Sequence, residues 1–161
     1  RVPDLDLGFD DAVVGHNAQS LRREVGDFVL KRNDGLFAYQ LAVVVDDAAQ
    51  GITEVVRGAD LLDSTPRQIW LQQALGLPTP AYLHLPLVLD EHGRKLGKSR
   101  ASLPVDAGDP LPALRAALRF LGQSEHTARG SVADLLQRAT NAFDIDAIPA
   151  AIPSRIVEGS D

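Results

Sequence analysis

Strand-like and helix-like segments alternate up to about residue 93 of this sequence, and helix-like segments follow. In the first part, residues 52–57 (ITEVVR) favour a strand because the segment is short and rich in β-branched side chains. In the second part, residues 109–122 and the segment that starts at Ser131 keep their apolar positions at helical spacing. This shift predicts an α/β domain over residues 1–93 and a small, mainly helical domain over residues 94–161.

The clearest local signal is a helix start at Thr65-Pro66-Arg67-Gln68. We expect Thr65 to cap this helix, with Pro66 at the first helical position and Gly76 at its end. Residues 82–89 (YLHLPLVL) then predict a strand in which Pro86 requires an edge position or an irregularity.

The signals before residue 50 are mixed. Phe28-Val29-Leu30 has strand character, and Asn33-Asp34-Gly35 after it indicates a turn. Residues 37–45 (FAYQLAVVV) suit either a buried strand or a buried helix, because periodicity does not separate the two. Residues 1–24 have no pattern that fixes their structure.

Composition excludes several classes of function. The 161 residues contain no cysteine, which excludes disulfides, thiolate zinc sites and a cysteine nucleophile within them, and which fits a reducing cytoplasm. The net charge of -6 argues against a broad nucleic-acid-binding face. There is no apolar run long enough to cross a bilayer, so we expect no membrane partner. The chain starts with Arg and contains no Met, so we expect it to be part of a longer protein.

A basic segment follows residue 93 and invites two phosphate-binding interpretations. A P-loop needs four residues between its first Gly and the Gly-Lys-Ser, whereas only three separate Gly93 from Gly97, and residues 101–104 do not continue as an amphipathic helix. The other interpretation is the lysine loop of class I synthetases, whose lysines neutralise charge on ATP phosphates. Taken alone, the pentapeptide favours a solvated basic turn over a lysine loop. The loop would consist of Lys95, Leu96, Gly97, Lys98 and Ser99.

Several segments, in the same order and spacing, resemble the glutamyl-tRNA synthetase family. They are residues 27–47, 51–60, 64–68 and 84–87, followed by the lysine loop, and the resemblance covers about residues 25–122. The resemblance implies the second half of a Rossmann-type class I catalytic domain, with residues 1–24 at the end of an insertion. It also favours a helix for residues 37–45.

The resemblance also implies roles for individual residues. Tyr39 and Arg57 would contact the glutamate substrate, Lys98 and Lys95 would contact ATP, and the backbone at His84 and Leu85 would hold adenine. The residues taken by themselves leave other interpretations open: Tyr39 as a core tyrosine, Arg57 as a surface partner of Asp60 or Asp63, and His84 as a packed strand residue. Asp46 and Asp47 could bond the substrate amine, but by themselves they favour an acidic helix end or a solvated turn.

Within the family, the short region after Ser99 is similar to the glutamyl-Q tRNA(Asp) synthetases, which lack an anticodon-binding domain. The resemblance implies an ATP-dependent ligase that forms glutamyl-adenylate with Mg²⁺ and transfers glutamate to the queuosine base of tRNA(Asp). The alternatives are a piece of a glutamyl-tRNA synthetase that charges tRNA(Glu), and a non-catalytic relative that binds RNA or protein.

Two departures from the family pattern limit this expectation. Gly97 stands where the family usually has Ser, which removes a hydroxyl from the loop. The family's N-terminal half, with its first nucleotide-binding signature and a zinc site in many members, is not in these residues. We therefore expect no metal in this chain, zinc only in the missing part, an inactive isolated fragment, and a cytoplasmic monomer when full-length.

Overall fold

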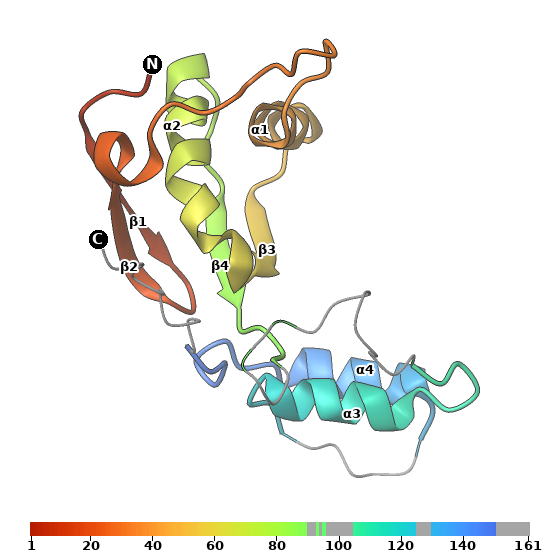
Figure 1. The fold of residues 1–161 in the computed structure, drawn as a ribbon. Helices are drawn as coiled ribbons and strands as arrows, with labels where there is room; N and C mark the ends of the chain where they lie inside the picture. Colours follow the sequence, from red (N-terminus) through yellow and green to blue (C-terminus); the bar gives the residue numbers. More distant parts are fainter. Residues whose placement is uncertain (90–92, 94, 96–104, 125–129, 151–161) are drawn as a thin grey trace. The chain divides into compact units, whose positions relative to one another are not determined.

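A computed structural model describes residues 1–89, 93, 95, 105–124 and 130–150. The chain divides into two compact units, Arg1–His84 and Leu85–Asp161. The first unit combines a mixed sheet with helices (Figure 1), which confirms the expected α/β class. The second unit carries two helices in its described part. A domain boundary after residue 93 stays a prediction.

The first unit begins with a hairpin that the sequence pattern did not predict. β1 (Asp6–Asp11) pairs antiparallel with β2 (Gly15–Ser20), in register from Asp6 opposite Ser20 to Asp11 opposite Gly15. The turn between the strands ends at Gly15, whose φ of 80° is accessible mainly to glycine. A short π-helical turn, η1 (Leu21–Val25), follows the hairpin.

The ambiguous segment after residue 37 forms a helix, α1 (Tyr39–Gln50), as the family resemblance implied. The strand expected at Phe28–Leu30 is wrong, because Phe28 instead packs edge-on against Trp70. Only an isolated bridge, between Lys31 and Phe37, forms in this region. It closes the predicted turn, in which Gly35 has a φ of 88°.

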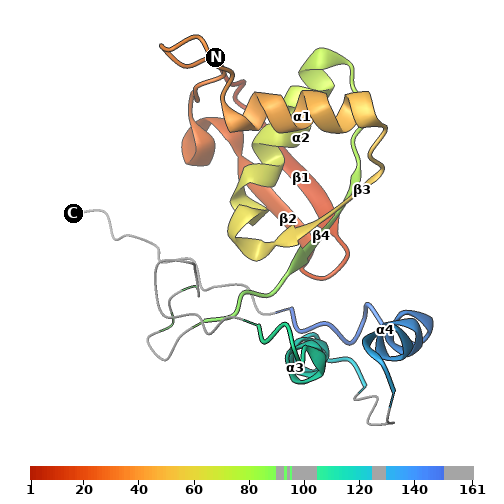
Figure 2. The same cartoon turned by 90° about the vertical axis from the view of Figure 1, so that its right-hand side faces the viewer.

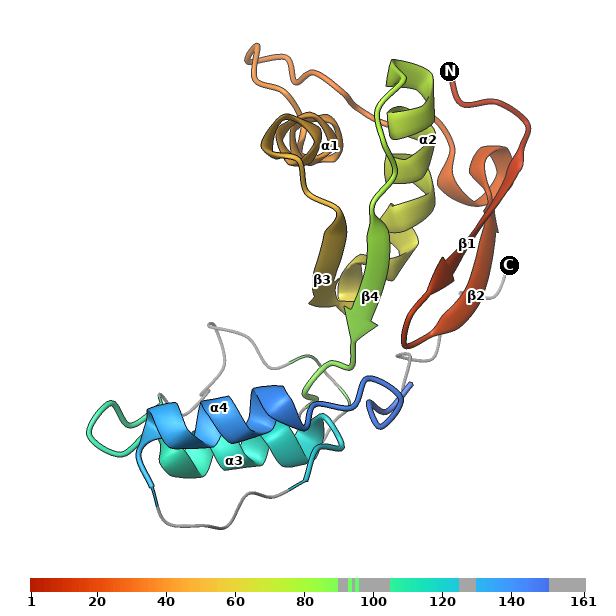
Figure 3. The ribbon, with the colours of Figure 1, turned by 180° about the vertical axis from the view of Figure 1, so that it is seen from behind.

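The sheet is completed by two strands joined through a helix. β3 (Glu54–Gly58) leads into a 3₁₀ segment, η2 (Ala59–Ser64), then into α2 (Thr65–Leu75) and β4 (Ala81–Leu85). The strand order is β2-β1-β4-β3, so that β4 lies between the hairpin and the edge strand β3 (Figure 3). β4 stops before Pro86, which is consistent with the missing donor of proline.

The expected capping role of Thr65 is wrong. η2 runs directly into α2, so Thr65 is already helical and its hydroxyl is used elsewhere in the fold. Gly76 does end the helix in a left-handed conformation, as predicted.

α2 supplies the side chains that join the sheet to the helical layer, and α1 packs against it (Figure 2). Ile69 of α2 is buried together with Leu7, Leu21 and Tyr82, which come from β1, η1 and β4. This apolar cluster packs β1, η1 and β4 against α2.

The second unit contains the two helices predicted for the end of the chain, α3 (Leu111–Phe120) and α4 (Val132–Asn141). Ser131 and Asp134 form a capping box at the start of α4, which satisfies two backbone N–H groups. Gln123 bonds both the backbone N–H and the carbonyl of Asp144 at 2.8 Å. Among the helices of the described residues, none is long and apolar enough to span a membrane.

Candidate functional site

An open hollow of about 310 Å³ lies between α1 and β3. Tyr39, Val43 and Asp47 line it from one face of α1, since residues four apart in a helix point the same way. Arg57 and its neighbours on β3 line the opposite wall, together with Leu61 of η2. The hollow is therefore lined by a tyrosine, an arginine and an aspartate, together with apolar side chains.

Four hydrogen bonds hold the Arg57 guanidinium. Its Nε donates to His84 Nε2 at 3.0 Å and its Nη1 to Gln68 Oε1 at 2.8 Å. Its Nη2 donates to Thr65 Oγ1 at 2.8 Å and to the carbonyl of Leu61 at 3.3 Å. The guanidinium also lies over the Tyr82 ring, 5.3 Å from its centroid. Arg57 is thus turned into the fold at the edge of the hollow, with little freedom to rotate.

Glutamine side chains extend this network to α1. The Gln68 amide that accepts from Arg57 donates to Gln40 Oε1 at 2.8 Å, and Gln40 donates to Ser64 Oγ at 3.1 Å. Gln72 donates to the hydroxyl of Tyr82 at 3.0 Å. The residues that hold Arg57 are therefore themselves held, as a precise binding site requires.

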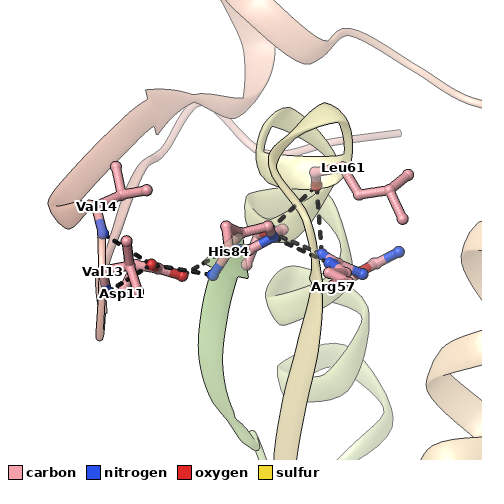
Figure 4. Close-up of polar contacts among 8 residues, drawn as sticks. Asp11, Val13, Val14, Arg57, Leu61 and His84 are labelled. Carbon is pink, nitrogen blue, oxygen red and sulfur yellow. Dashed lines mark hydrogen bonds and ion pairs between the residues drawn. The ribbon is translucent and has the colours of Figure 1, made fainter. Parts of the chain in front are cut away.

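A buried carboxylate lies behind His84, on the far side from Arg57. Asp11 Oδ2 is 2.6 Å from His84 Nδ1, and both side chains are 0% exposed. Asp11, His84 and Arg57 form one line across β1, β4 and β3 (Figure 4).

The charge states along this line follow from burial and hydrogen bonding. Burial alone would raise the pKa of the Asp11 carboxyl, but hydrogen bonds from the Val14 amide, the His84 side chain and other amides hold it below its ordinary value. Burial lowers the pKa of His84; Asp11 opposes this shift and the charge of Arg57 adds to it. Burial also lowers the pKa of Arg57, against the influence of Tyr82, Tyr39 and Asp47. At neutral pH the line is an ionised Asp11, a neutral His84 and a cationic Arg57.

The structure brings some of the expected site residues together. Tyr39 and Arg57 line the same hollow, and Tyr39 is 52% exposed, so its interpretation as a core tyrosine is wrong. Asp47 lines the hollow too, whereas Asp46 is exposed. His84 is packed inside the sheet layer, as the residues taken by themselves suggested.

The lysine loop is placed only in part. Lys95 forms an isolated bridge with Leu89, and the remaining loop residues, Leu96, Gly97, Lys98 and Ser99, lie outside the described residues. Their role in binding ATP, and that of the backbone at His84 and Leu85, stays a prediction.

Sequence reasoning missed the residues that support Arg57. Asp11 lies in a polar strand without β-branched side chains, and Thr65 and Gln68 were taken as signals of a helix start. The one available signal was that His84 sits in an apolar strand, because a buried imidazole needs partners for both ring nitrogens.

Comparisons with known proteins identify the family of the chain. Residues 3–150 match the family model described as "tRNA synthetases class I (E and Q), catalytic domain". The glutamyl-Q tRNA(Asp) synthetase of Xanthomonas campestris pv. campestris (strain 8004) is 62% identical over 149 residues, which are 91% of this chain and 50% of that protein. The protein of the same name from Pseudomonas syringae pv. syringae (strain B728a) is 54% identical over 151 residues, 92% of this chain and 51% of the relative. The chain thus spans about half the length of these curated relatives.

A solved structure shares the fold. The glutamate-tRNA synthetase of Elizabethkingia anophelis superposes with a TM-score of 0.72 at 24% identity, covering 93% of this chain and 34% of that one. At this level of identity the likeness concerns the fold. With the family model matching most of the chain, the protein belongs to the catalytic-domain family of the class I tRNA synthetases for E and Q.

Proposed function

We propose that the whole protein activates L-glutamate with ATP and transfers it to the queuosine base of tRNA(Asp). The observation that carries this proposal is the placement of Arg57 and Tyr39 on one hollow, with Arg57 oriented by four hydrogen bonds. The name shared by the relatives with 52–62% identity supports the choice of glutamate and tRNA(Asp).

Arg57 suits a carboxylate because guanidinium N–H groups make short, charge-assisted bonds to carboxylate oxygens. We infer that it binds the side-chain carboxylate of glutamate, since an arginine bound to the reacting carboxylate would weaken that nucleophile. The Tyr39 hydroxyl would donate to the same ligand; that Tyr39 lines the same hollow supports this role. Asp47, also on the hollow, is a candidate partner for the substrate amine.

The reaction would join the α-carboxylate oxygen of glutamate to the α-phosphate of ATP and expel pyrophosphate. Lys95 and Lys98 would neutralise the charge that builds on the phosphate oxygens. ATP would bring Mg²⁺, which proteins commonly bind through nucleotide phosphates and water. In the transfer step, a nucleophilic group of the queuosine base would form a new bond to the glutamyl carbonyl carbon and lose its proton, as the acyl–phosphate bond breaks and AMP leaves.

The test of activation is glutamate-dependent ATP–pyrophosphate exchange by the whole protein. Arg57→Ala should lower kcat/KM for glutamate by about 100-fold, because it removes a charge-assisted contact to the substrate. Arg32→Ala is the matched control: Arg32 is exposed and pairs with Asp34 at 2.7 Å, away from the hollow, and its loss should leave exchange unchanged. An intact protein without exchange would favour the non-catalytic relative.

The nucleic-acid substrate needs a separate experiment. Glutamate transfer should occur to queuosine-containing tRNA(Asp) and not to tRNA(Glu). Transfer to tRNA(Glu) instead would make the protein a glutamyl-tRNA synthetase. Gel filtration of the whole protein, with and without tRNA, checks the expected monomer.

A further inference from the structure

The line of buried polar groups behind the hollow has a consequence for Arg57. We propose that Asp11 and His84 are positioning residues, which fix the orientation of the Arg57 guanidinium toward the glutamate carboxylate. The inference rests on the proposed function of Arg57 as a substrate ligand. Neither Asp11 nor His84 lines the hollow, so each would act through Arg57.

Asp11 is itself fixed by the turn that follows β1. Its Oδ1 accepts from the amides of Val13 and Val14, both at 3.0 Å, and from the amide of His84 at 3.2 Å. These bonds leave Oδ2 directed at His84 Nδ1, at 2.6 Å. The carboxylate thus has a set place between β1 and β4, and its position is determined by backbone geometry.

The side-chain contacts of His84 determine its tautomer. Nδ1 faces Asp11, and Nε2 faces both Arg57 Nε and Thr65 Oγ1, the latter at 3.3 Å; the Thr65 hydroxyl can donate or accept, so Arg57 decides. The Nε of arginine always carries a hydrogen, so His84 Nε2 has to accept from Arg57 and Nδ1 has to carry the proton. An ionised Asp11 stabilises this tautomer by accepting from Nδ1. If Nε2 were protonated, two N–H donors would face each other at 3.0 Å and Arg57 would have to turn away.

The contact with His84 holds the Nε end of the Arg57 guanidinium, which the other partners of Arg57 do not hold. Gln68, Thr65 and Leu61 hold the Nη atoms, whereas only His84 holds Nε among the hydrogen bonds of the described residues. The His84 ring stacks on Tyr82 with an interplanar angle of 12°, and the Arg57 guanidinium lies over Tyr82 as well. Asp60 and Arg57 also influence the charge of His84, in addition to Asp11.

The first test measures the tautomer of His84 in the whole protein. A long-range ¹⁵N–¹H correlation spectrum of the histidine rings, assigned with His84→Gln, should show His84 as the neutral Nδ1–H form at pH 7. In Asp11→Asn, the amide should donate to Nδ1 and shift the ring to the Nε2–H form. An Nε2–H or doubly protonated His84 in the unaltered protein would overturn the inference.

The second test separates positioning from packing with two amide substitutions. The amide of Gln reaches the place of Nε2, so His84→Gln keeps an acceptor for Arg57 and loses the contact with Asp11. The amide of Asn reaches the place of Nδ1, so His84→Asn does the reverse. We expect the glutamate KM in ATP–pyrophosphate exchange to rise by about tenfold in His84→Asn and Asp11→Asn, and by only a few-fold in His84→Gln.

The outcomes distinguish this inference from the proposed function. No exchange by the unaltered protein sinks the function itself. Exchange with an unchanged glutamate KM in Asp11→Asn and His84→Asn sinks only the positioning role. An equal rise in the KM for ATP and glutamate, or equal effects of the Gln and Asn variants, would indicate general damage to the fold and also overturn it. Circular dichroism of each variant establishes that it is folded.

Discussion

At the scale of single residues, the buried pair Asp11–His84 should make stability depend on pH. The fold lowers the pKa of His84 below its ordinary 6.5, so the unfolded chain binds more protons just below that pH. His84 therefore contributes stability that is complete above pH 6.5 and is lost as the pH falls toward its folded pKa. The pKa of Asp11 is also lowered, so its contribution is complete above 3.8 and is lost in stronger acid.

Urea unfolding at a series of pH values checks this prediction. The free energy of unfolding should decrease from pH 7 to pH 5 by up to about 1.4 kcal/mol per pH unit, the slope for one proton. His84→Gln has no group that titrates at this position, so its free energy of unfolding should vary less over the same range. Identical pH profiles for the two proteins would contradict the assigned charge states.

Some residues of the candidate site could be named from the sequence, and others could not. Tyr39 and Arg57 were named from the family resemblance, and the structure places both on one hollow. Their role as glutamate ligands remains a proposal. Asp11 could not be named, because it is 73 positions from His84 and only the parallel pairing of β1 with β4 brings the two together. Such a contact leaves no local pattern in the sequence.

At the scale of elements, local signals predicted the segments whose structure is decided locally. The turn at Asn33-Asp34-Gly35, the β-branched strand β3 and the start of α4 after Ser131 all formed as their residues indicated. Thr65 was misassigned because η2 precedes α2 without a break and Arg57 takes the hydroxyl that a cap would use. Phe28 was misassigned because Trp70, on α2, offers its side chain a packing partner. In both cases a contact from outside the segment overrode a local preference.

Gly122, which follows α3, has a backbone conformation and surroundings that should make its replacement destabilising. Gly122 has a φ of 70°, and a Cβ there would overlap the carbonyl of Ala147. Gly122→Ala should therefore lower the free energy of unfolding of the second unit by about 3 kcal/mol, from backbone strain and the clash together. Gly35→Ala is the matched control, because its φ is 88° and no atom lies near the added Cβ. It should cost about 1 kcal/mol.

Thermal unfolding followed by far-ultraviolet circular dichroism compares the two variants. A Gly122→Ala protein that is as stable as Gly35→Ala would show that the segment at Ala147 moves aside without cost. That result would contradict the close packing of the α3 end against residues 144–148.

At the scale of the whole molecule, the described residues that line the hollow come from α1, β3, η2 and the segment between α1 and β3, and β3 is an edge strand of the sheet. Apolar and aromatic side chains that line the hollow are exposed, including Val56 of β3 at 61% and Tyr39 of α1 at 52%. An edge strand offers unpaired backbone groups, and exposed apolar side chains favour further contacts. Since the chain spans about half the length of its curated relatives, we expect the remainder of the protein to cover this surface.

This arrangement predicts that the 161-residue chain by itself has no glutamate-dependent ATP–pyrophosphate exchange, because an adenylate must be enclosed on more sides than the hollow provides. The isolated chain should also bind an apolar dye such as anilinonaphthalene sulfonate more strongly than the whole protein at equal concentration. Charging an exposed apolar side chain, as in Val56→Lys, should reduce dye binding by the isolated chain. In the whole protein, the same substitution should impair exchange if β3 is covered there. An isolated chain that is active and binds no more dye than the whole protein would show that β3 and the hollow need no further partner.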